Sequence, residues 1–473
     1  MVRPKIGVVA SESSESSARV ILVDGMEKKV RAEDVVLIRN KNGPDVIGVL
    51  RKGTGLNEAL KLGGYRPGVA YAKAGGEVSK ARETYDYRVA VIGAVGERVE
   101  QNKSIISPGS EVELFTDEDN PMDMIAKGVE KLAWIGHYEG HESWRIPVDV
   151  SFIPYHIGIF ATTGGGKSFL ARHVIIPLLS EAGYAVIVFD WKGRDYAPFF
   201  DSKLVIGLEG LALDEEVVIQ YIAEKAKFFG YSGEYALRNP IIDALEDFLF
   251  QQSWRGKSPQ EFRHMIEENM YESLKNDKRA HLRFSRYWRR ITDDDLKSVL
   301  GDKKPEDLIK MAKSNGILIL DMKKAGAEQK LSIFLSVANY LKERMENDEE
   351  VNLALVIDEG PQYAPFKPQG IQSAATEMIK NLCALGRSYK LCIVILAQAI
   401  SGDIGINAAV RRNLNTQFFG RIHPLDMEEA QKWLEPYGIG TDFLLSLPPG
   451  RFYFAGIMNP SPVPLLMSFK IGD

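Results

Sequence analysis

Residues 161–168 read ATTGGGKS, and this segment constrains the fold more than any other part of the chain. An apolar, β-prone run, His156–Phe160, precedes it. A run with helical apolar spacing, Phe169–Ser180, follows it. A glycine-rich turn that ends in Lys-Ser between a strand and a helix is typical of a phosphate-binding loop. The alternative is a glycine-rich turn with a chance Lys-Ser pair, which the flanking elements do not favour.

Each residue type in this loop suits a nucleotide. Glycines let backbone N–H groups face phosphate oxygens. Lys167 can reach the β- and γ-phosphates, and the Ser168 hydroxyl can bind Mg²⁺. Ala161 stands where the pattern has its first glycine, which is acceptable if that position does not need a positive φ. The predicted ATP-binding residues are Thr163, Gly164, Gly165, Gly166, Lys167, Ser168 and Phe169.

A second hydrophobic strand, Leu353–Asp358, ends in two acids, Asp358 and Glu359. Ligands gather at the carboxyl ends of strands in parallel sheets. We predict that Asp358 binds Mg²⁺ and that Glu359 is the general base that polarises the attacking water. The alternative is a capped strand end with no catalytic role.

Other polar residues follow predicted strands. Gln398 comes after an apolar strand and is predicted to sense the γ-phosphate or orient water, or else to bond local backbone. Asp190 could support the metal or cap the following turn. Arg387 precedes the Gln398 strand and is the best candidate for an arginine finger from a neighbouring subunit. Lesser candidates are Arg411, Arg412 and Arg421.

The chain divides into three parts. Residues 1–115 contain short alternating runs separated by turn residues, which predict a small β-barrel or sandwich. Residues 116–150 read as a linker and a strand that leads into the loop. Residues 151–473 alternate strands and helices, which predicts a parallel sheet covered on both faces, with a helical insertion at about 211–313. The predicted barrel strands are Lys5–Ala10, Ala18–Asp24, Asp34–Arg39, Asp45–Leu50, Tyr87–Val95 and Glu111–Phe115. The predicted core strands are His156–Phe160, Ala185–Asp190, Lys203–Ile206, Gly316–Asp321, Leu353–Asp358, Leu391–Leu396, Thr416–Arg421 and Arg451–Ala455.

Composition excludes some classes of protein. The 473 residues are 45% hydrophobic with a net charge of −5, so a basic surface for nucleic acid must be local. The sequence has no apolar run of about 18 residues and no apolar signal region, so we expect no membrane partner and a cytoplasmic location.

The chain resembles the HerA family, within the HerA/FtsK group of RecA-like hexameric DNA-pumping ATPases. The shared features are the Gly164–Ser168 loop, Asp190 with Lys192-Gly193, Asp358-Glu359 with the downstream Ala364-Pro365, Gly386-Arg387, Gln398, and the end of the chain from Leu447-Pro448-Pro449-Gly450 onward. The N-terminal β module resembles the HAS-barrel of that family. Three departures stand out: Ala161 for the first glycine, Gly165 for a common serine, and Gly360-Pro361 where many members have Ala-His.

The resemblance implies a RecA-like P-loop ATPase core, a homo-hexameric ring, ATP and Mg²⁺ as cofactors, and double-stranded DNA in the central channel. It also implies a NurA-like nuclease partner in the processing of DNA ends. The departure at Pro361 puts any conformational relay from that position in doubt. Two rival functions remain: an ATP-dependent scaffold that activates a nuclease with little translocation, and a small-molecule P-loop kinase.

One basic segment indicates DNA binding independently of the family resemblance. Residues 278–290 read KRAHLRFSRYWRR. On a helix, Arg279, Arg283, Arg286 and Arg290 would share one face, and Phe284, Trp288 and Ile291 another, buried one. Such a stripe could contact phosphates. The alternative is a solvated face paired with nearby acids such as Asp293–Asp295.

Overall fold

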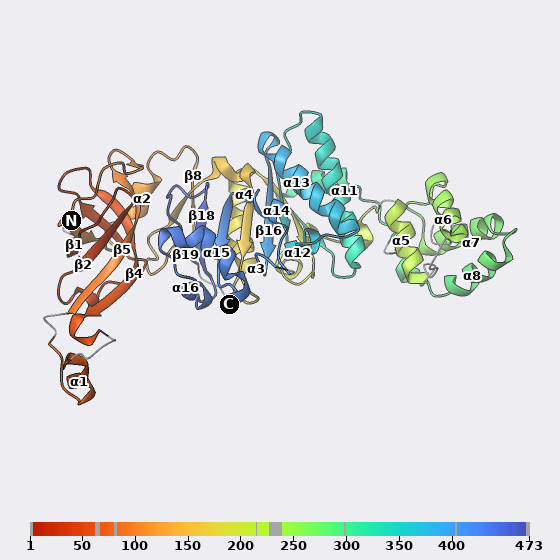
Figure 1. Cartoon of the computed structure of the whole chain (residues 1–473). Helices are drawn as coiled ribbons and strands as arrows, with labels where there is room; N and C mark the ends of the chain where they lie inside the picture. Colours follow the sequence, from red (N-terminus) through yellow and green to blue (C-terminus); the bar gives the residue numbers. More distant parts are fainter. Residues whose placement is uncertain are drawn as a thin grey trace.

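The computed structural model describes residues 3–61, 67–79, 83–213, 215–226, 239–297, 299–402 and 404–469. An N-terminal barrel, a central α/β core and a helical lobe follow one another along the molecule, with the barrel and the lobe at opposite ends (Figure 1). Within the described ranges, every helix is too short or too polar to cross a membrane.

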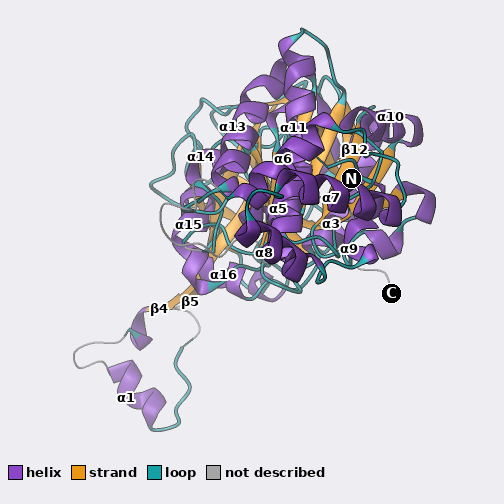
Figure 2. Cartoon of the chain, turned by 90° about the vertical axis from the view of Figure 1, so that its right-hand side faces the viewer, coloured by secondary structure: helices purple, strands orange, loops and turns teal. Residues whose placement is uncertain are grey.

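The barrel is a closed six-stranded sheet in the order β2-β1-β7-β3-β4-β5, closed by pairing of β2 with β5, and β6 extends it beyond β5. Its strands are β1 (Lys5–Val9), β2 (Ser17–Leu22), β3 (Val35–Arg39), β4 (Val46–Asn57), β5 (Glu83–Val95), β6 (Val99–Glu100) and β7 (Glu111–Leu114). Alternate apolar side chains, such as Val20 and Leu22 of β2, fill its interior. The predicted barrel is confirmed, but β4 and β5 run beyond it as a ribbon toward helix α1 (Pro67–Lys73), which projects from the body (Figure 2).

The core holds a ten-stranded sheet in the order β13-β14-β12-β15-β16-β11-β17-β18-β19-β9. The first seven strands in this order are parallel, and the last three are antiparallel. The strands are β9 (His137–Tyr138), β11 (Ile157–Phe160), β12 (Ala185–Asp190), β13 (Val205–Gly207), β14 (Ile317–Asp321), β15 (Leu353–Ile357), β16 (Leu391–Ala397), β17 (Thr416–Phe419), β18 (Arg451–Gly456) and β19 (Leu465–Ser468).

The central strands are buried on both faces, as expected of a parallel sheet. Alternate residues of a strand pack into two different hydrophobic clusters, one on each face of the sheet. Ile187 and Phe189 of β12 pack with helices α10 (Pro305–Asn315), α11 (Ala327–Glu346) and α13 (Ile371–Tyr389). Val186 and Val188 pack on the other face, with the helix formed by α3 (Lys167–Leu170), a π-turn (Ala171–Ile175) and α4 (Ile176–Glu181). The predicted α/β core with a mostly parallel sheet is confirmed.

The segment before the core departs from a simple linker and strand. After α2 (Pro121–Ala126), β8 (Leu132–Ile135) and β10 (Ile146–Asp149) form a separate antiparallel pair. The strand predicted at the end of residues 116–150 corresponds to β10, which ends at Asp149, where a 3₁₀ helix (Val150–Tyr155) begins. The Asp149 side chain accepts a hydrogen bond from Ser151 N and so caps that helix.

The helical lobe is inserted between β13 and β14. Its helices are α5 (Glu215–Ala226), α6 (Pro240–Gln251), α7 (Pro259–Ser273), α8 (Lys278–Trp288) and α9 (Asp293–Lys297). Aromatic side chains hold them together: Trp254 packs on Phe262, and Phe284 stacks on Trp288. The predicted helical insertion is confirmed.

A buried polar cluster joins the barrel to the core. The Arg51 guanidinium of β4 pairs with both carboxylate oxygens of Glu33 at 3.0 Å. It also donates to the carbonyl oxygens of Tyr437 (3.0 Å) and Pro464 (2.6 Å) in the core. The Tyr453 hydroxyl of β18 donates to Glu33 at 2.9 Å. Because both charged partners are buried and hydrogen-bonded, this cluster fixes how the barrel sits on the sheet.

Candidate nucleotide-binding site

The loop between β11 and α3 has the conformation that its glycines allow. Gly164 and Gly166 have φ values of 75° and 97°, which side chains disfavour. Ala161 keeps a negative φ and lies directly after β11, so the missing glycine imposes no strain there. A Cβ atom on Gly165 would lie 2.9 Å from the Cβ of Ala161. The two departures from the family pattern are therefore complementary: the methyl group at 161 takes the space that a side chain at 165 would need.

Lys167 begins the helix after the loop. Its Nζ donates to the carbonyl oxygens of Ala161 (2.6 Å) and Thr162 (3.1 Å). Burial lowers the pKa of Lys167, and the negative charges of Glu359 and Asp358 oppose that shift. The ammonium group thus lies within the electrostatic reach of both predicted acids, although about 190 residues separate them in sequence.

The sheet order explains why these segments meet. Strand β16 lies between β11 and β15, and all three run parallel, so their carboxyl ends share one edge. The phosphate loop follows β11, Asp358 follows β15 and Gln398 follows β16. The structure therefore brings the predicted loop, acids and amide to one edge of the sheet.

Asp358 is suited to a metal ion. The residue is 3% exposed, and its Oδ2 has no hydrogen-bond partner among the described residues. Burial raises the pKa of Asp358 to about 7, with further contributions from the charges of Glu359, Asp195 and Asp190. A divalent cation would relieve the cost of this buried, crowded carboxyl. Ser168 is the second residue of α3, and its hydroxyl would be the loop's ligand for such an ion.

Glu359 lies at the centre of a chain of polar contacts. Its Oε1 accepts a hydrogen bond from Gln398 Nε2 at 2.7 Å and forms an ion pair with Lys192. The Thr163 hydroxyl of the loop donates to Gln398 Oε1 at 2.9 Å. Glu359 has φ 53° and ψ 49°, a left-handed conformation that a non-glycine residue adopts at a cost. Through Gln398 and Thr163, these contacts connect the Glu359 carboxylate to the phosphate loop.

Lys192 also belongs to this site. The sequence did not predict its contact with Glu359. Burial alone would lower the pKa of Lys192, but its hydrogen bond with Glu359 and the charge of that residue raise it. Its position directly after the β12 strand end was the available signal, since β12 neighbours β15 in the sheet.

Asp190 has the capping role rather than a metal-binding one. Its carboxylate accepts hydrogen bonds from the backbone N–H groups of Gly193 (2.9 Å), Tyr196 (3.0 Å) and Ala197 (3.0 Å). With three donors the buried carboxylate is satisfied without a cation. It fixes the turn that presents Lys192.

The predicted arginines lie in different places. Arg387 is exposed near the end of α13, with its guanidinium over the Tyr155 ring at 5.1 Å. Both residues lie at the amino ends of the strands, roughly 20 Å from the loop edge given the seven residues of β16. Arg387 therefore cannot serve the loop of its own chain, and a finger role requires a neighbour. Arg411 pairs with Glu429 at 3.0 Å within the fold.

Arg421 lies at the loop itself. Its backbone carbonyl accepts from Thr162 N at 2.7 Å, and its Nε donates to Thr162 Oγ1 at 3.3 Å. This arginine follows β17, the other neighbour of β11. The strand order thus brings a second cation to the phosphate loop of the same chain.

Phe169 packs its ring on His173 (4.1 Å between centroids) and on Phe469 (6.0 Å). These contacts tie the helix after the loop to the end of the chain. These packing contacts are enough to explain why residue 169 is aromatic. The role of Phe169 in binding ATP therefore remains a prediction.

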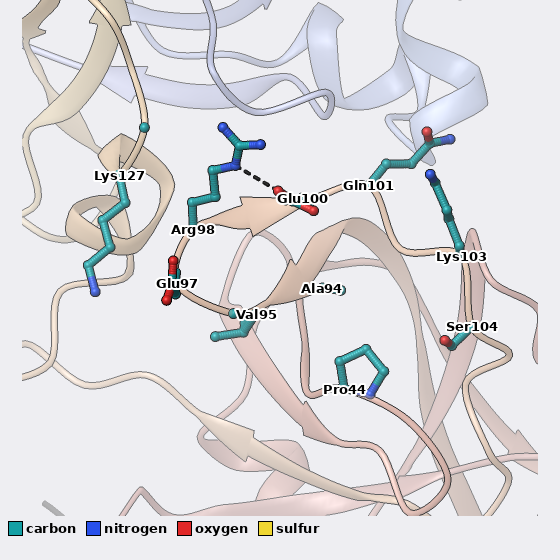
Figure 3. A pocket seen from close by; sticks show the side chains of 12 residues that line it. Pro44, Ala94, Val95, Glu97, Arg98, Glu100, Gln101, Lys103, Ser104 and Lys127 are labelled. Carbon is teal, nitrogen blue, oxygen red and sulfur yellow. Dashed lines mark hydrogen bonds and ion pairs between the residues drawn. The ribbon is translucent and has the colours of Figure 1, made fainter.

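A cavity of about 800 Å³ lies elsewhere, at the barrel (Figure 3). Its lining includes Pro44, Lys103 and Lys127 and the ion pair between Arg98 and Glu100, at 2.7 Å. It contains no residue of the phosphate loop or of the acidic strand end, so it is separate from the site described above.

A phosphate loop and an acidic pair at the shared edge of a parallel sheet define the chain as a P-loop NTPase. Residues 133–341 match the family described as "Helicase HerA, central domain". This segment, 209 of the 473 residues, is therefore similar to the central domain of that family.

The solved structures that match the chain share little sequence with it. VirB4 of Thermoanaerobacter pseudethanolicus is 16% identical, with a TM-score of 0.47, 72% of this chain and 97% of that chain being covered. The bacterial conjugative coupling protein TrwBΔN70 is 14% identical, with a TM-score of 0.43 and coverages of 76% and 93%. The genome packaging NTPase B204 from Sulfolobus turreted icosahedral virus 2 is 11% identical, with a TM-score of 0.35 and coverages of 67% and 99%. No curated protein matches the sequence significantly.

Proposed function

We propose that the protein is an ATP-driven translocase of double-stranded DNA that works as a homo-hexameric ring and processes DNA ends with a NurA-like nuclease. The observation that carries the proposal is the meeting of Lys167, Asp358, Glu359 and Gln398 at one sheet edge in a chain of HerA type. The finer points of substrate, ring and partner rest on the family resemblance.

In this proposal the loop N–H groups and Lys167 bind the triphosphate of ATP. Ser168 and Asp358 hold Mg²⁺, which supplies charge neutralisation at the phosphates when bound. Glu359 accepts the proton of the attacking water, and Gln398 orients that water through the hydrogen bond it already makes to Glu359. The ion pair between Lys192 and Glu359 Oε1 links the turn after β12 to the proposed base, and in this proposal the pair opens during hydrolysis.

Arg387 is proposed as the finger that completes the site of the adjacent protomer. Its exposure at the opposite edge of the sheet suits a ring in which each site lies at a subunit boundary. Removing this arginine is expected to slow turnover strongly while ATP still binds.

The test is the rate of ATP hydrolysis with and without linear duplex DNA, measured beside the mass of the assembly. The proposal predicts a hexamer whose turnover rises with duplex DNA. A monomer that does not respond to DNA would refute it. A Glu359→Gln ring that binds ATP, does not hydrolyse it and still activates the nuclease would replace the motor with the ATP-dependent scaffold.

A further inference from the structure

Helix α8 presents a basic face to solvent at the end of the molecule opposite the barrel (Figure 1). Phe284 and Trp288 on its other face are 0% and 3% exposed, packed within the lobe. The buried face is the one that the sequence pattern predicts, but Arg283 of the predicted basic face is only partly exposed, with its Nε buried. Arg279 and Arg286 are exposed on the helix, and Arg289 is exposed at its C-cap.

Two of the three acids that could neutralise this face, Asp293 and Asp295, have other partners within the lobe. Asp293 accepts hydrogen bonds from Arg263 (2.9 Å) and Gln260 (3.0 Å) of α7. Asp295 pairs with Lys225 of α5 at 2.9 Å and accepts from Thr292.

Acids nearer to α8 are occupied as well. Asp277 caps α8 through the backbone N–H groups of Arg279 and Ala280. Glu267 accepts the indole N–H of Trp288 at 2.8 Å. Within the described part of the chain, Arg279, Arg286 and Arg289 form no side-chain hydrogen bond or ion pair.

The charge of this segment differs from that of the whole chain. Residues 275–290 contain seven Lys or Arg and one Asp, a local net charge of +6, while the complete chain has −5. A compact basic stripe on an otherwise acidic protein is the electrostatic pattern of a polyanion-binding surface. The 11 residues of α8 span roughly 16 Å. Duplex DNA carries one charge per about 1.7 Å of its axis, so several phosphates lie within that length.

We propose that the basic face of α8 binds the phosphate backbone of duplex DNA, at a site separate from the nucleotide-binding edge of the sheet. The proposal rests on the proposed function for its choice of nucleic acid. The face contacts DNA through charge and without base recognition, since its cations are flexible side chains on one exposed helix turn after another. The motor would therefore contact DNA at residues other than those that hydrolyse ATP.

The experiment measures how tightly the full chain, without nucleotide, binds a fluorescent DNA duplex of random sequence and about 40 base pairs. The measurement is repeated over a series of salt concentrations. The test variant combines Arg279→Ala, Arg286→Ala and Arg289→Ala. A matched variant removes three exposed lysines of the barrel, with Lys28→Ala, Lys29→Ala and Lys41→Ala. Loss of three phosphate contacts is expected to reduce the slope of log affinity against log salt by about 3 and to weaken binding at least tenfold. The lysine variant is expected to match the unmodified chain.

Two controls keep the result decisive. A triple arginine-to-lysine variant keeps the charges and is expected to retain the salt slope, whereas a folding defect would not discriminate between lysine and alanine. The ATPase rate without DNA is expected to be unchanged in all variants, because α8 lies outside the nucleotide site.

Equal slopes for the alanine variant and the unmodified chain would overturn the DNA site. So would a selective loss of binding to phosphatidylserine vesicles with duplex binding intact. If turnover of that same variant still rises with duplex DNA, the proposed function survives the failure of this site.

Discussion

The Arg51–Glu33 pair provides a sharp test of how the barrel is attached to the ATPase core. The Arg51 side chain is 1% exposed and that of Glu33 is 7% exposed, so neither charge is well solvated. Arg51→Met keeps the length of the side chain and removes its charge. Glu33 is then left buried with the Tyr453 hydroxyl as its remaining side-chain donor. Breaking a buried pair in this way costs about 3–5 kcal/mol of the free energy of unfolding.

The double variant separates the ion pair from simple packing loss. Glu33→Gln leaves Arg51 its two backbone carbonyl partners in the core. Combining Glu33→Gln with Arg51→Met buries no charge at all, so the combined cost is expected to fall short of the sum of the single costs by about 2 kcal/mol.

Urea unfolding followed by tryptophan fluorescence measures these free energies, since Trp144 is fully buried in an apolar cluster that contains residues of both the barrel and the core. Costs that add within about 0.5 kcal/mol, or a cost of Arg51→Met below about 1 kcal/mol, would refute the reasoning. Such a result would mean that the barrel is held by apolar contacts alone.

Three further predictions follow from particular contacts. Burial lowers the pKa of His156 to about 4, so the unfolded chain takes up the proton first as pH falls; unfolding titrations should show the unmodified chain losing about 3 kcal/mol relative to His156→Gln between pH 6.5 and 4, and parallel pH curves would contradict this. Lys192→Met should raise DNA-independent ATP hydrolysis about two- to fivefold, because it releases Glu359 from a half-exposed ion pair, and slower turnover would reverse this role. Gly360→Ala should destabilise the fold by about 1–3 kcal/mol in thermal unfolding, since its Cβ would lie 2.3 Å from Ile395 Cγ2, and an unchanged midpoint would show that the strand can move.

The sequence predicted the elements that have a strong local pattern. The glycine loop, the two acids and Gln398 each follow an apolar strand, and parallel strands place such ends at one edge whatever their separation in sequence. The barrel strands and the buried face of α8 followed from their periodicity in the same way.

Features that depend on distant pairing could not be predicted. Strand β9 has only two residues, His137 and Tyr138, so it carries no periodicity, and its place beside β19 is set by the finished sheet. The Lys192–Glu359 pair depends on the path of a turn that Asp190 caps. The Arg51 cluster joins residues hundreds of positions apart, and nothing in either local sequence marks it.

The departures from the family pattern are explained by contacts between segments of the folded chain. Ala161 and Gly165 look like two independent changes in sequence, yet their side-chain positions compete for one space. Gly360 lies against β16 so closely that the alanine common in the family would clash here. Packing between segments, which a single sequence does not encode locally, decides both positions.

The central claim is that ATP and Mg²⁺ are bound between the loop at Lys167 and the acids at Asp358 and Glu359. It is tested most directly by measuring ATP affinity and turnover together in Lys167→Ala and Glu359→Gln. The account predicts that Lys167→Ala loses both, whereas Glu359→Gln binds ATP about as tightly as the unmodified chain and turns over at least a hundredfold more slowly. Hydrolysis by Glu359→Gln at the unmodified rate, or full ATP affinity in Lys167→Ala, would contradict it.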